Sequence, residues 1–289
     1  MKKIVLSLAL ILFTLVQYAQ GVLKESLSIH SAILNRNVNY SIYLPEHYDS
    51  GNRKFPVLYL LHGYTDNETG WTQFGEVSAI ADKAISSGKA TPMIIAMPDA
   101  GITWYINESS GKERYEDFFV QEFIPYIDSI YRTRKTKQFR AVAGLSMGGF
   151  GTLIYSMKHP DLFSAAAPLS AAVWTDEQFI NFPDSSYTKT FEHLYGTAKG
   201  KERINAHYQK NSILNIVNAS APKQFDGIRF YIDCGDKDFL IKGNMALHAA
   251  MIDKKIEHEF RVRSGVHDWK YWRTALPEVL KFVSESFHR

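Results

Sequence analysis

The chain has 289 residues, of which 45% are hydrophobic and 22% are charged, and its formal net charge is +3. This composition is typical of a globular protein and excludes disordered, collagen-like and coiled-coil chains. Cys234 is the only cysteine in the sequence, which excludes an internal disulfide and a cysteine-rich zinc site.

The first 20 residues have the pattern of a secretory signal peptide. Lys2 and Lys3 precede an apolar run over residues 4–16, and small or polar residues follow. The run is shorter than the roughly 20 residues of a membrane span, so a retained anchor helix is the weaker interpretation. We expect cleavage near Ala19 or Gln20.

Export of this kind would place the mature chain, residues 21–289, outside the cytoplasm, either secreted or in a bacterial periplasm. Removal of the two lysines leaves the mature chain close to neutral. A nearly neutral chain gives no electrostatic reason to expect nucleic acid or an anionic membrane as a partner. We therefore expect no nucleic-acid partner and no membrane anchor in the mature form.

Strands and helices alternate along the rest of the chain. Residues 38–44 alternate apolar and polar side chains, which predicts a half-exposed strand near a sheet edge. Residues 56–61 are continuously apolar, as in a strand buried on both faces. By the same criteria we expect further strands at 93–97, 139–143, 164–169, 228–232 and 258–262, and helices at 77–85, 119–130, 150–157, 246–252 and 279–287. The alternation predicts a single α/β domain over residues 21–289, with a mostly parallel sheet and helices on both faces.

Residues 171–226 interrupt this alternation. The segment is polar and aromatic, contains no convincing strand, and is too long for a plain connection. We expect an insertion of short helices beside the active site, before the strand that carries the catalytic acid. A solvated excursion without such a role is an equally good interpretation of the composition.

A candidate nucleophile lies directly after the strand expected at 139–143. Residues 144–148 read Gly-Leu-Ser-Met-Gly, the G-x-S-x-G pattern, and a helix follows. Such a strand-to-helix turn holds the serine at strained backbone angles, and the flanking glycines remove bulk that would clash. Ser146 is therefore expected to project its hydroxyl above the sheet.

A serine nucleophile needs a histidine base and an acid that orients the histidine, and in α/β-hydrolases these follow the serine along the chain. The strand ending at Ile232 runs into a loop with three aspartates, Asp233, Asp236 and Asp238, where the acid is expected. His267 lies in the loop after the last strand, where the base is expected. Spacing within the acidic loop does not decide which carboxylate acts.

The oxyanion of an acyl-transfer transition state needs two N–H donors that are fixed in advance. One is expected from the backbone of Met147, which follows the nucleophile. The other should come from the loop after the strand at 56–61, where Tyr64 is the candidate and His62 is expected to brace the loop.

These residues resemble the putative-esterase (esterase D-like) group of α/β-hydrolases, closest to the feruloyl and acetyl esterases of carbohydrate esterase family one. The group also includes tributyrin esterases, S-formylglutathione hydrolases and mycolyltransferases. The resemblance runs in order from about residue 28 to residue 287. Its motifs are 61–64 (Leu-His-Gly-Tyr), 97–99 (Met-Pro-Asp), 104–105 (Trp-Tyr), 114–117 (Arg-Tyr-Glu-Asp), 144–149 (Gly-Leu-Ser-Met-Gly-Gly), 159–163 (His-Pro-Asp-Leu-Phe) and 267–269 (His-Asp-Trp).

The resemblance implies an α/β-hydrolase fold with Ser146 as nucleophile and His267 as base. It implies Asp238 as the acid, because the acid of this group closes a Gly-x-x-Asp turn, and Asp236 stays the alternative. It also points to Tyr64 and Met147 as oxyanion donors.

The sequence thus predicts a serine carboxylic ester hydrolase that forms an acyl-enzyme and needs no metal or cofactor. The expected substrate is a small-molecule or oligosaccharide ester, namely a short acyl or feruloyl ester of plant carbohydrate. Aromatic side chains suit such groups, although core packing explains each of them equally well. The candidates for substrate binding are Trp71, Trp104, Tyr105 and Trp269.

Three other hypotheses stay open at this point. The same triad would serve an acyltransferase that uses a sugar alcohol as acceptor, or a thioesterase like the S-formylglutathione hydrolases. A catalytically silent carbohydrate-binding or scaffold protein is the third, and the intact set of serine, histidine and acid argues against it.

Overall fold

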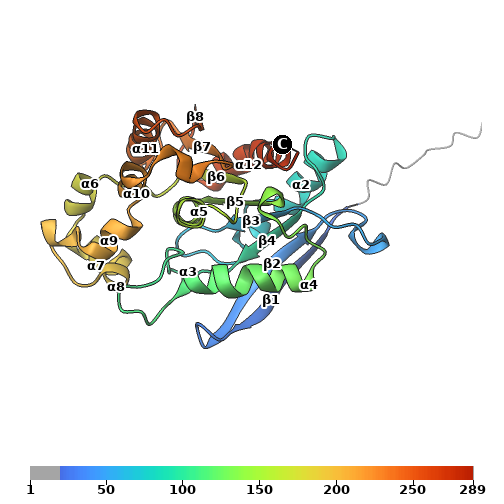
Figure 1. Ribbon diagram of the computed structural model, residues 1–289, viewed down its shortest axis with the longest axis horizontal. Coiled ribbons are helices and arrows are strands. Elements are labelled where there is room, and N and C mark those ends of the chain that lie inside the picture. Colours follow the sequence, from blue (N-terminus) through green and yellow to red (C-terminus); the bar gives the residue numbers. More distant parts are fainter. Residues whose placement is uncertain (1–19, 289) are drawn as a thin grey trace, which may run out of the picture.

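The computed structural model describes residues 20–288. The predicted signal peptide lies outside the described residues, except for Gln20. The described chain forms an eight-stranded sheet in the order β1-β2-β4-β3-β5-β6-β7-β8 (Figure 1). β2 is antiparallel to both of its neighbours, and the remaining pairs are parallel, as the sequence predicts. The strands are β1 (Val22–Ser31), β2 (Arg36–Leu44), β3 (Val57–Leu61), β4 (Ile94–Pro98), β5 (Arg140–Leu145), β6 (Ala165–Leu169), β7 (Arg229–Gly235) and β8 (Glu259–Arg263).

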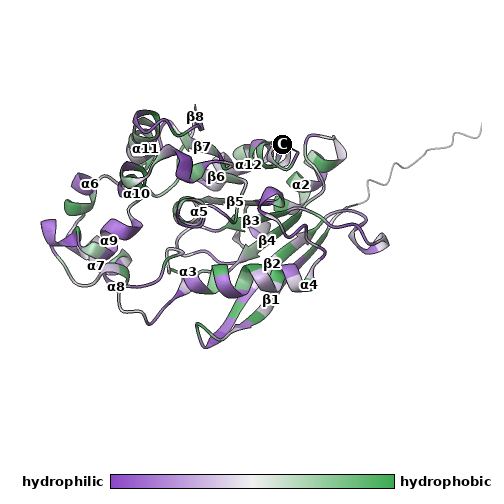
Figure 2. Cartoon of the chain, viewed as in Figure 1, coloured by the Kyte–Doolittle hydropathy of each residue, from purple (hydrophilic) through white to green (hydrophobic). Residues whose placement is uncertain are grey.

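The central strands lie between two hydrophobic cores. In β3, Leu58 and Leu60 face one core, while Val57, Tyr59 and Leu61 face the other, because successive side chains of a strand point to opposite faces. Helices α2 (Val77–Ser86) and α12 (Trp269–Ser286) cover the first face, and α4 (Ile124–Ile130), α5 (Met147–Lys158) and α11 (Ile241–Asp253) cover the second. In Figure 2, hydrophilic segments lie on surface helices such as α7 (Asp184–Thr190) and α9 (Ala206–Asn211).

The helices and helical turns outside the insertion are α1 (Gly70–Gln73), α2 (Val77–Ser86), α3 (Tyr115–Phe118), the π-helical η2 (Phe119–Phe123), α4 (Ile124–Ile130), α5 (Met147–Lys158), α11 (Ile241–Asp253), α12 (Trp269–Ser286), and the 3₁₀ turns η1 (Tyr48–Ser50) and η3 (Lys137–Phe139).

Strand β2 differs from the prediction of a half-exposed strand, because residues 40–44 are all buried. Strand β1 occupies the edge and pairs with β2 along its length. The face of β2 that carries Tyr43 is covered by α2, where Asp82 accepts a hydrogen bond of 2.6 Å from the Tyr43 hydroxyl. Apolar and polar side chains therefore alternate along β2 although both faces of the strand are covered, because one face buries the polar groups of Ser41 and Tyr43.

Strand β1 is not predicted from the sequence, because its alternating pattern is broken. The register with β2 shifts between Lys24 and Leu27, where Ser26 has a positive φ of 49°. A bulge of this kind interrupts the two-residue periodicity from which strands are predicted. Helix α12 also begins ten residues before the predicted start at 279, because the Asp268 side chain accepts the Tyr271 N–H at 2.8 Å and caps it.

The interrupted segment 171–226 folds into short helices, as predicted. It contributes the left end of the molecule in Figure 1, and its aromatic residues Phe179, Phe191, Tyr195 and Tyr208 pack together as part of the larger core on one face of the sheet. Its elements are α6 (Asp176–Ile180), α7 (Asp184–Thr190), α8 (Glu192–Tyr195), η4 (Gly200–Arg203), α9 (Ala206–Asn211), α10 (Ile213–Ala219) and η5 (Pro222–Phe225).

A charged cluster attaches this insertion to the rest of the domain. The Lys158 ammonium at the end of α5 contacts the Glu116 carboxylate at 2.6 Å and the Asn211 side-chain oxygen at 3.1 Å. Burial raises the pKa of Glu116, but hydrogen bonds from His159 and Lys158 outweigh burial and leave that pKa below its ordinary value. The carboxylate is therefore ionised and joins α3, α5 and α9.

Arg203 organises the insertion from inside. Its side chain is 1% exposed, donates to the carbonyl oxygens of Ile180 and Phe182 at 3.1 and 2.6 Å, and forms an ion pair with Asp184. The guanidinium also lies over the Tyr187 ring. Carbonyl groups at the end of α6 and in the turn after it thus share a single buried cation.

Within residues 20–288, none of the helices has the length and apolar character needed to span a membrane.

Arg203→Ala is expected to lower the free energy of unfolding by about 2–4 kcal/mol, because it leaves buried carbonyl groups without donors. Lys199→Ala is the matched control, because Lys199 pairs with the same Asp184 from an exposed position. The control is expected to change stability by less than about 0.5 kcal/mol. Urea denaturation followed by circular dichroism measures both, and equal effects would contradict the organising role of Arg203.

Candidate active site

Ser146 lies at the sharp turn between β5 and α5, with φ 54° and ψ −114°. This is a strained backbone conformation for a residue with a side chain. A Cβ atom on Gly148 would lie 2.5 Å from the Leu61 carbonyl oxygen, and one on Gly144 would lie 2.6 Å from the Gly148 oxygen. The two glycines of the motif therefore allow the close approach that the sequence analysis predicted.

The Ser146 hydroxyl lies at one end of a line of hydrogen bonds. Its Oγ is 2.9 Å from His267 Nε2, and His267 Nδ1 is 2.8 Å from Asp238 Oδ2. His267 lies in the loop between β8 and α12, and Asp238 lies in the turn between β7 and α11. A carboxylate only accepts hydrogen bonds, so Nδ1 carries the proton and Nε2 presents its lone pair to the serine.

Asp238 is 2% exposed and remains charged. Burial alone would raise its pKa, but hydrogen bonds from His267 and from the Leu240 N–H, at 2.8 Å, outweigh burial and leave the pKa below its ordinary value. A buried negative charge next to Nδ1 favours the imidazolium form of His267 after proton transfer.

Asp236, the alternative acid, does not contact His267. It is exposed, and its carboxylate accepts the Gly265 N–H at 2.9 Å. The backbone adds two more bonds between the same loops, from Asp236 N–H to Arg263 O at 2.8 Å and from Lys237 N–H to Gly265 O at 3.0 Å. Asp236 therefore fastens the histidine loop to the acidic loop.

Asp233 holds both ends of the histidine loop. Its side chain is 0% exposed and accepts hydrogen bonds from Tyr231 at 2.9 Å, from Arg263 at 2.7 Å and from the Tyr271 hydroxyl. Arg263 is the last residue of β8, and Tyr271 lies in the first turn of α12. One buried carboxylate thus fixes the chain before and after His267.

The predicted oxyanion donors lie on either side of Ser146. A Cβ atom on Gly63 would lie 3.8 Å from Ser146 Cβ, so the loop after β3 passes beside the nucleophile. Within residues 20–288, neither the Tyr64 N–H nor the Met147 N–H donates a hydrogen bond to the protein. Both donors are therefore available to a ligand beside the serine.

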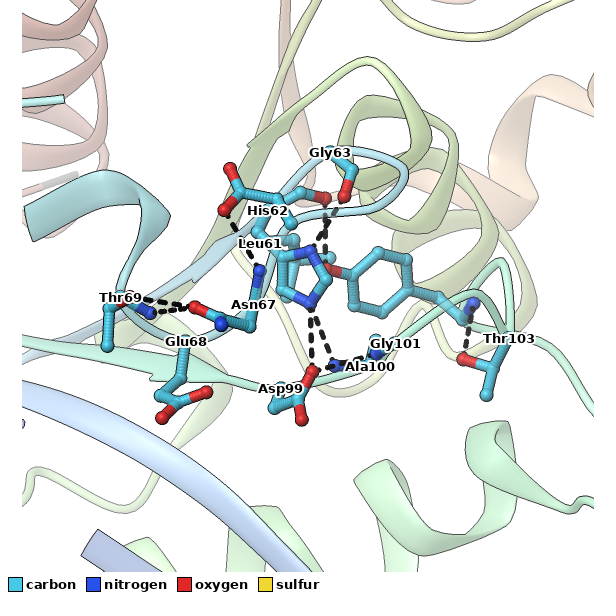
Figure 3. A network of polar contacts seen from close by, with 12 residues as sticks. Leu61, His62, Gly63, Asn67, Glu68, Thr69, Asp99, Ala100, Gly101 and Thr103 are labelled. Atoms are coloured by element: carbon cyan, nitrogen blue, oxygen red, sulfur yellow. Dashed lines mark hydrogen bonds and ion pairs between the residues drawn. The ribbon is translucent and has the colours of Figure 1, made fainter. Parts of the chain in front are cut away.

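His62 braces this loop, as predicted (Figure 3). Its Nδ1 donates to the Gly63 carbonyl at 2.8 Å, and its Nε2 accepts the Ala100 N–H at 2.8 Å. The Tyr105 hydroxyl donates to the His62 carbonyl at 3.1 Å. Because the ring is 1% exposed and uses both nitrogens, it fixes the path of the chain next to Tyr64.

Two of the four predicted substrate-binding residues have fully buried side chains. Trp71 is 1% exposed and Tyr105 is 0% exposed. The Trp71 indole donates to the Leu61 carbonyl at 2.9 Å, and the Tyr105 hydroxyl contacts His62, so both anchor the backbone at the end of β3. Trp269 is half-buried against Trp71.

Trp104 is the predicted aromatic residue that lines a cavity. The cavity also contacts Phe150, Ala172 and Trp174. Ser146 does not line this cavity; Ala172 links the two, because its N–H donates to the Ser146 backbone carbonyl at 3.0 Å. The Trp104 Nε1–H is buried without a hydrogen-bond partner in the described chain. The other lining residues are Val173, Phe179, Tyr195, Tyr208, Asn211, Ser212 and Ile213.

Two aromatic residues near the site, Trp174 and Phe239, were missed from the sequence. Trp174 packs against Trp104, and the Phe239 ring contacts His267 at a centroid distance of 4.6 Å. Phe239 directly follows Asp238, but no sequence pattern separates an exposed phenylalanine from a buried one. Among residues 20–288, no three His, Cys, Asp or Glu side chains are grouped so that they could hold a metal ion.

Residues 31–283 match the family model described as "Putative esterase". A solved ferulic acid esterase is 33% identical with a TM-score of 0.82, over 93% of this chain and 99% of that one. An acetyl esterase from Caldicellulosiruptor saccharolyticus is 24% identical over 276 residues, which are 90% of this chain and 97% of that protein. The predicted resemblance and the α/β-hydrolase fold are confirmed.

The endo-1,4-beta-xylanase/feruloyl esterase of Xylanibacter ruminicola is 35% identical over 145 residues, which are 48% of this chain. The chain spans only 20% of the length of that relative, and 28% of an esterase from Mycobacterium tuberculosis. Both relatives are therefore much longer proteins than the domain they share with this chain.

Asp233→Ala is expected to lower the free energy of unfolding by about 2–4 kcal/mol, because it leaves the Arg263 guanidinium and two tyrosine hydroxyls without their acceptor. Asp236→Ala removes one exposed hydrogen bond to the same loop and is expected to cost about 1 kcal/mol. Chemical denaturation of both variants tests this difference. A larger loss in Asp236→Ala would contradict the assignment of Asp233 as the main anchor.

Proposed function

The chain belongs to the putative esterase family, and we propose that it is a carboxylic ester hydrolase with Ser146 as nucleophile, His267 as general base and Asp238 as the orienting acid. The observation that carries the proposal is the hydrogen-bonded line from the Ser146 hydroxyl through His267 to the buried Asp238 carboxylate. The line begins at a serine held on a strained turn, which exposes its Oγ above the sheet.

The proposed reaction begins when Ser146 Oγ attacks the ester carbonyl carbon and His267 Nε2 removes its proton. The carbonyl oxygen becomes an oxyanion, which the Tyr64 and Met147 N–H groups stabilise. Removing one such donor typically raises the barrier by about 2.7–4 kcal/mol. The imidazolium then gives its proton to the departing alcohol oxygen, and an acyl ester remains on Ser146.

Water completes the proposed cycle. His267 removes a proton from a water molecule that attacks the acyl carbon, and it returns the proton to Ser146 as the acid product leaves. Asp238 stays ionised throughout, in accord with its lowered pKa, and stabilises the imidazolium in both halves of the reaction. The proposed mechanism uses only side chains and backbone groups of this chain.

We propose a feruloyl, acetyl or other short acyl ester of plant carbohydrate as the substrate. Relatives that carry feruloyl esterase and acetyl esterase names support this class. The aromatic side chains of Trp104, Phe150 and Trp174 pack together near the Ser146 turn and suit an apolar or phenolic acyl group.

We also propose that residues 21–289 form one esterase domain that is exported by the signal peptide at residues 1–20. The amino-terminal charge and hydropathy pattern is the support for export.

Ser146→Ala is expected to abolish hydrolysis of methyl ferulate, acetylated xylan and tributyrin, since the nucleophile is absent. The same variant should lose covalent labelling by a fluorophosphonate, which reacts with activated serines. Wild-type enzyme measured beside the variant on all three esters identifies the acyl preference. Activity of the variant near the wild-type level would overturn the proposal, and exclusive action on tributyrin would remove the phenolic substrate.

Asp238→Asn is expected to lower kcat by about 10⁴-fold, because the amide stabilises the wrong imidazole tautomer and carries no charge. Asp236→Asn is the matched control in the same turn, and its kcat should stay within about threefold of wild type because Asp236 contacts only the Gly265 N–H. Steady-state kinetics on a nitrophenyl ester compares the two. The reverse order of losses would assign the acid to Asp236.

A further inference from the structure

Phe239 covers the exposed side of the His267 ring. It is 71% exposed, and its ring centroid is 4.6 Å from that of His267, with 53° between the planes. Trp272 contacts the imidazole as well, at 4.9 Å and 89°, and is 5% exposed. The imidazole therefore has one buried and one exposed aromatic neighbour.

The position of Phe239 is fixed by its two neighbours. Asp238 and Leu240 are each 2% exposed. The Asp238 carboxylate accepts the Leu240 N–H at 2.8 Å, and the Asp238 carbonyl accepts the Ile241 N–H at 3.0 Å, where α11 begins. A tight turn between the buried acid and a helix thus presents Phe239 to solvent, so the exposure of its ring does not come from a loose loop.

The proposed reaction requires the alcohol part of the ester to lie on this side. His267 must deliver a proton to the departing alcohol oxygen, so that oxygen lies next to Nε2. The carbonyl oxygen points instead to the Tyr64 and Met147 N–H groups. Because the exposed Phe239 ring contacts the same imidazole, the group attached to the alcohol oxygen lies beside Phe239.

We propose that Phe239 is a specificity-determining residue that binds the alcohol part of the substrate, and that this part is a sugar ring. The proposal rests on the proposed esterase function. An aromatic face is electron-rich, and the C–H groups on one face of a sugar ring match it while the hydroxyls stay in water. Because the ring is largely exposed, a sugar that is still part of a polysaccharide has room to extend into solvent.

The test compares two esters that share an acyl group and differ in the alcohol part, namely methyl ferulate and a feruloylated arabinose. If the wild type prefers acetyl esters, methyl acetate and an acetylated xylo-oligosaccharide replace this pair. Phe239→Ala is expected to lower kcat/KM for the sugar ester roughly 2- to 10-fold more than for the methyl ester, mainly through KM. Phe239→Tyr should restore the preference, because it keeps the aromatic face. Ile130→Ala, at an exposed apolar residue on α4 (57% exposed), is the matched control and should leave both esters unchanged.

An equal loss on both esters would show that Phe239 acts only through His267 and would overturn the inference, as would an unchanged preference. These outcomes differ from a failure of the proposed function. In that case the wild-type enzyme hydrolyses neither ester and has no more activity than Ser146→Ala. That result would overturn both the proposed esterase function and the role of Phe239.

Discussion

The close approach between the start of α5 and the end of β3 is the contact on which the site depends. Gly148 lies so near the Leu61 and His62 carbonyls that a single added carbon would overlap them. This contact forces the turn at Ser146 into its strained conformation and brings the loop with Gly63 and Tyr64 beside the serine. The geometry of the nucleophile and that of the oxyanion donors thus have one steric cause.

The partners of the serine come from a different part of the sheet, where β7 and β8 end. Polar groups below the site hold the loop of Asp238 and the loop of His267 in fixed positions relative to each other. Asp236 binds the Gly265 amide, and Asp233 binds Arg263 and Tyr271. The charges of two aspartates near the triad are therefore used to position His267. This arrangement explains why the end of β7 and the turn after it carry three aspartates, of which Asp238 is the one hydrogen-bonded to the imidazole in the described chain.

The role of a residue could be predicted from the sequence where that residue type has one physical reason to be present. The glycines around Ser146 and the order of serine, acid and histidine allowed the turn and its partners to be predicted. It was less informative where burial decides the role. Trp71 and Tyr105 lie next to the motifs but bind backbone carbonyls at the end of β3, and no local pattern distinguishes that from contact with a substrate. Strand β1 was missed because its bulge removes the periodicity that marks a strand.

The aromatic cluster of the insertion has a consequence for how such a domain diversifies. Phe179, Tyr195 and Tyr208 stabilise the insertion and also line the cavity that Ala172 links to Ser146, and of the other lining residues Trp104 and Phe150 come from outside the insertion. Substitutions inside this cluster would reshape one wall of the cavity and leave the backbone around the nucleophile in place. Selectivity for the acyl group could therefore drift during evolution, or be redesigned in the laboratory, while the sheet and the loops at its end stay constant.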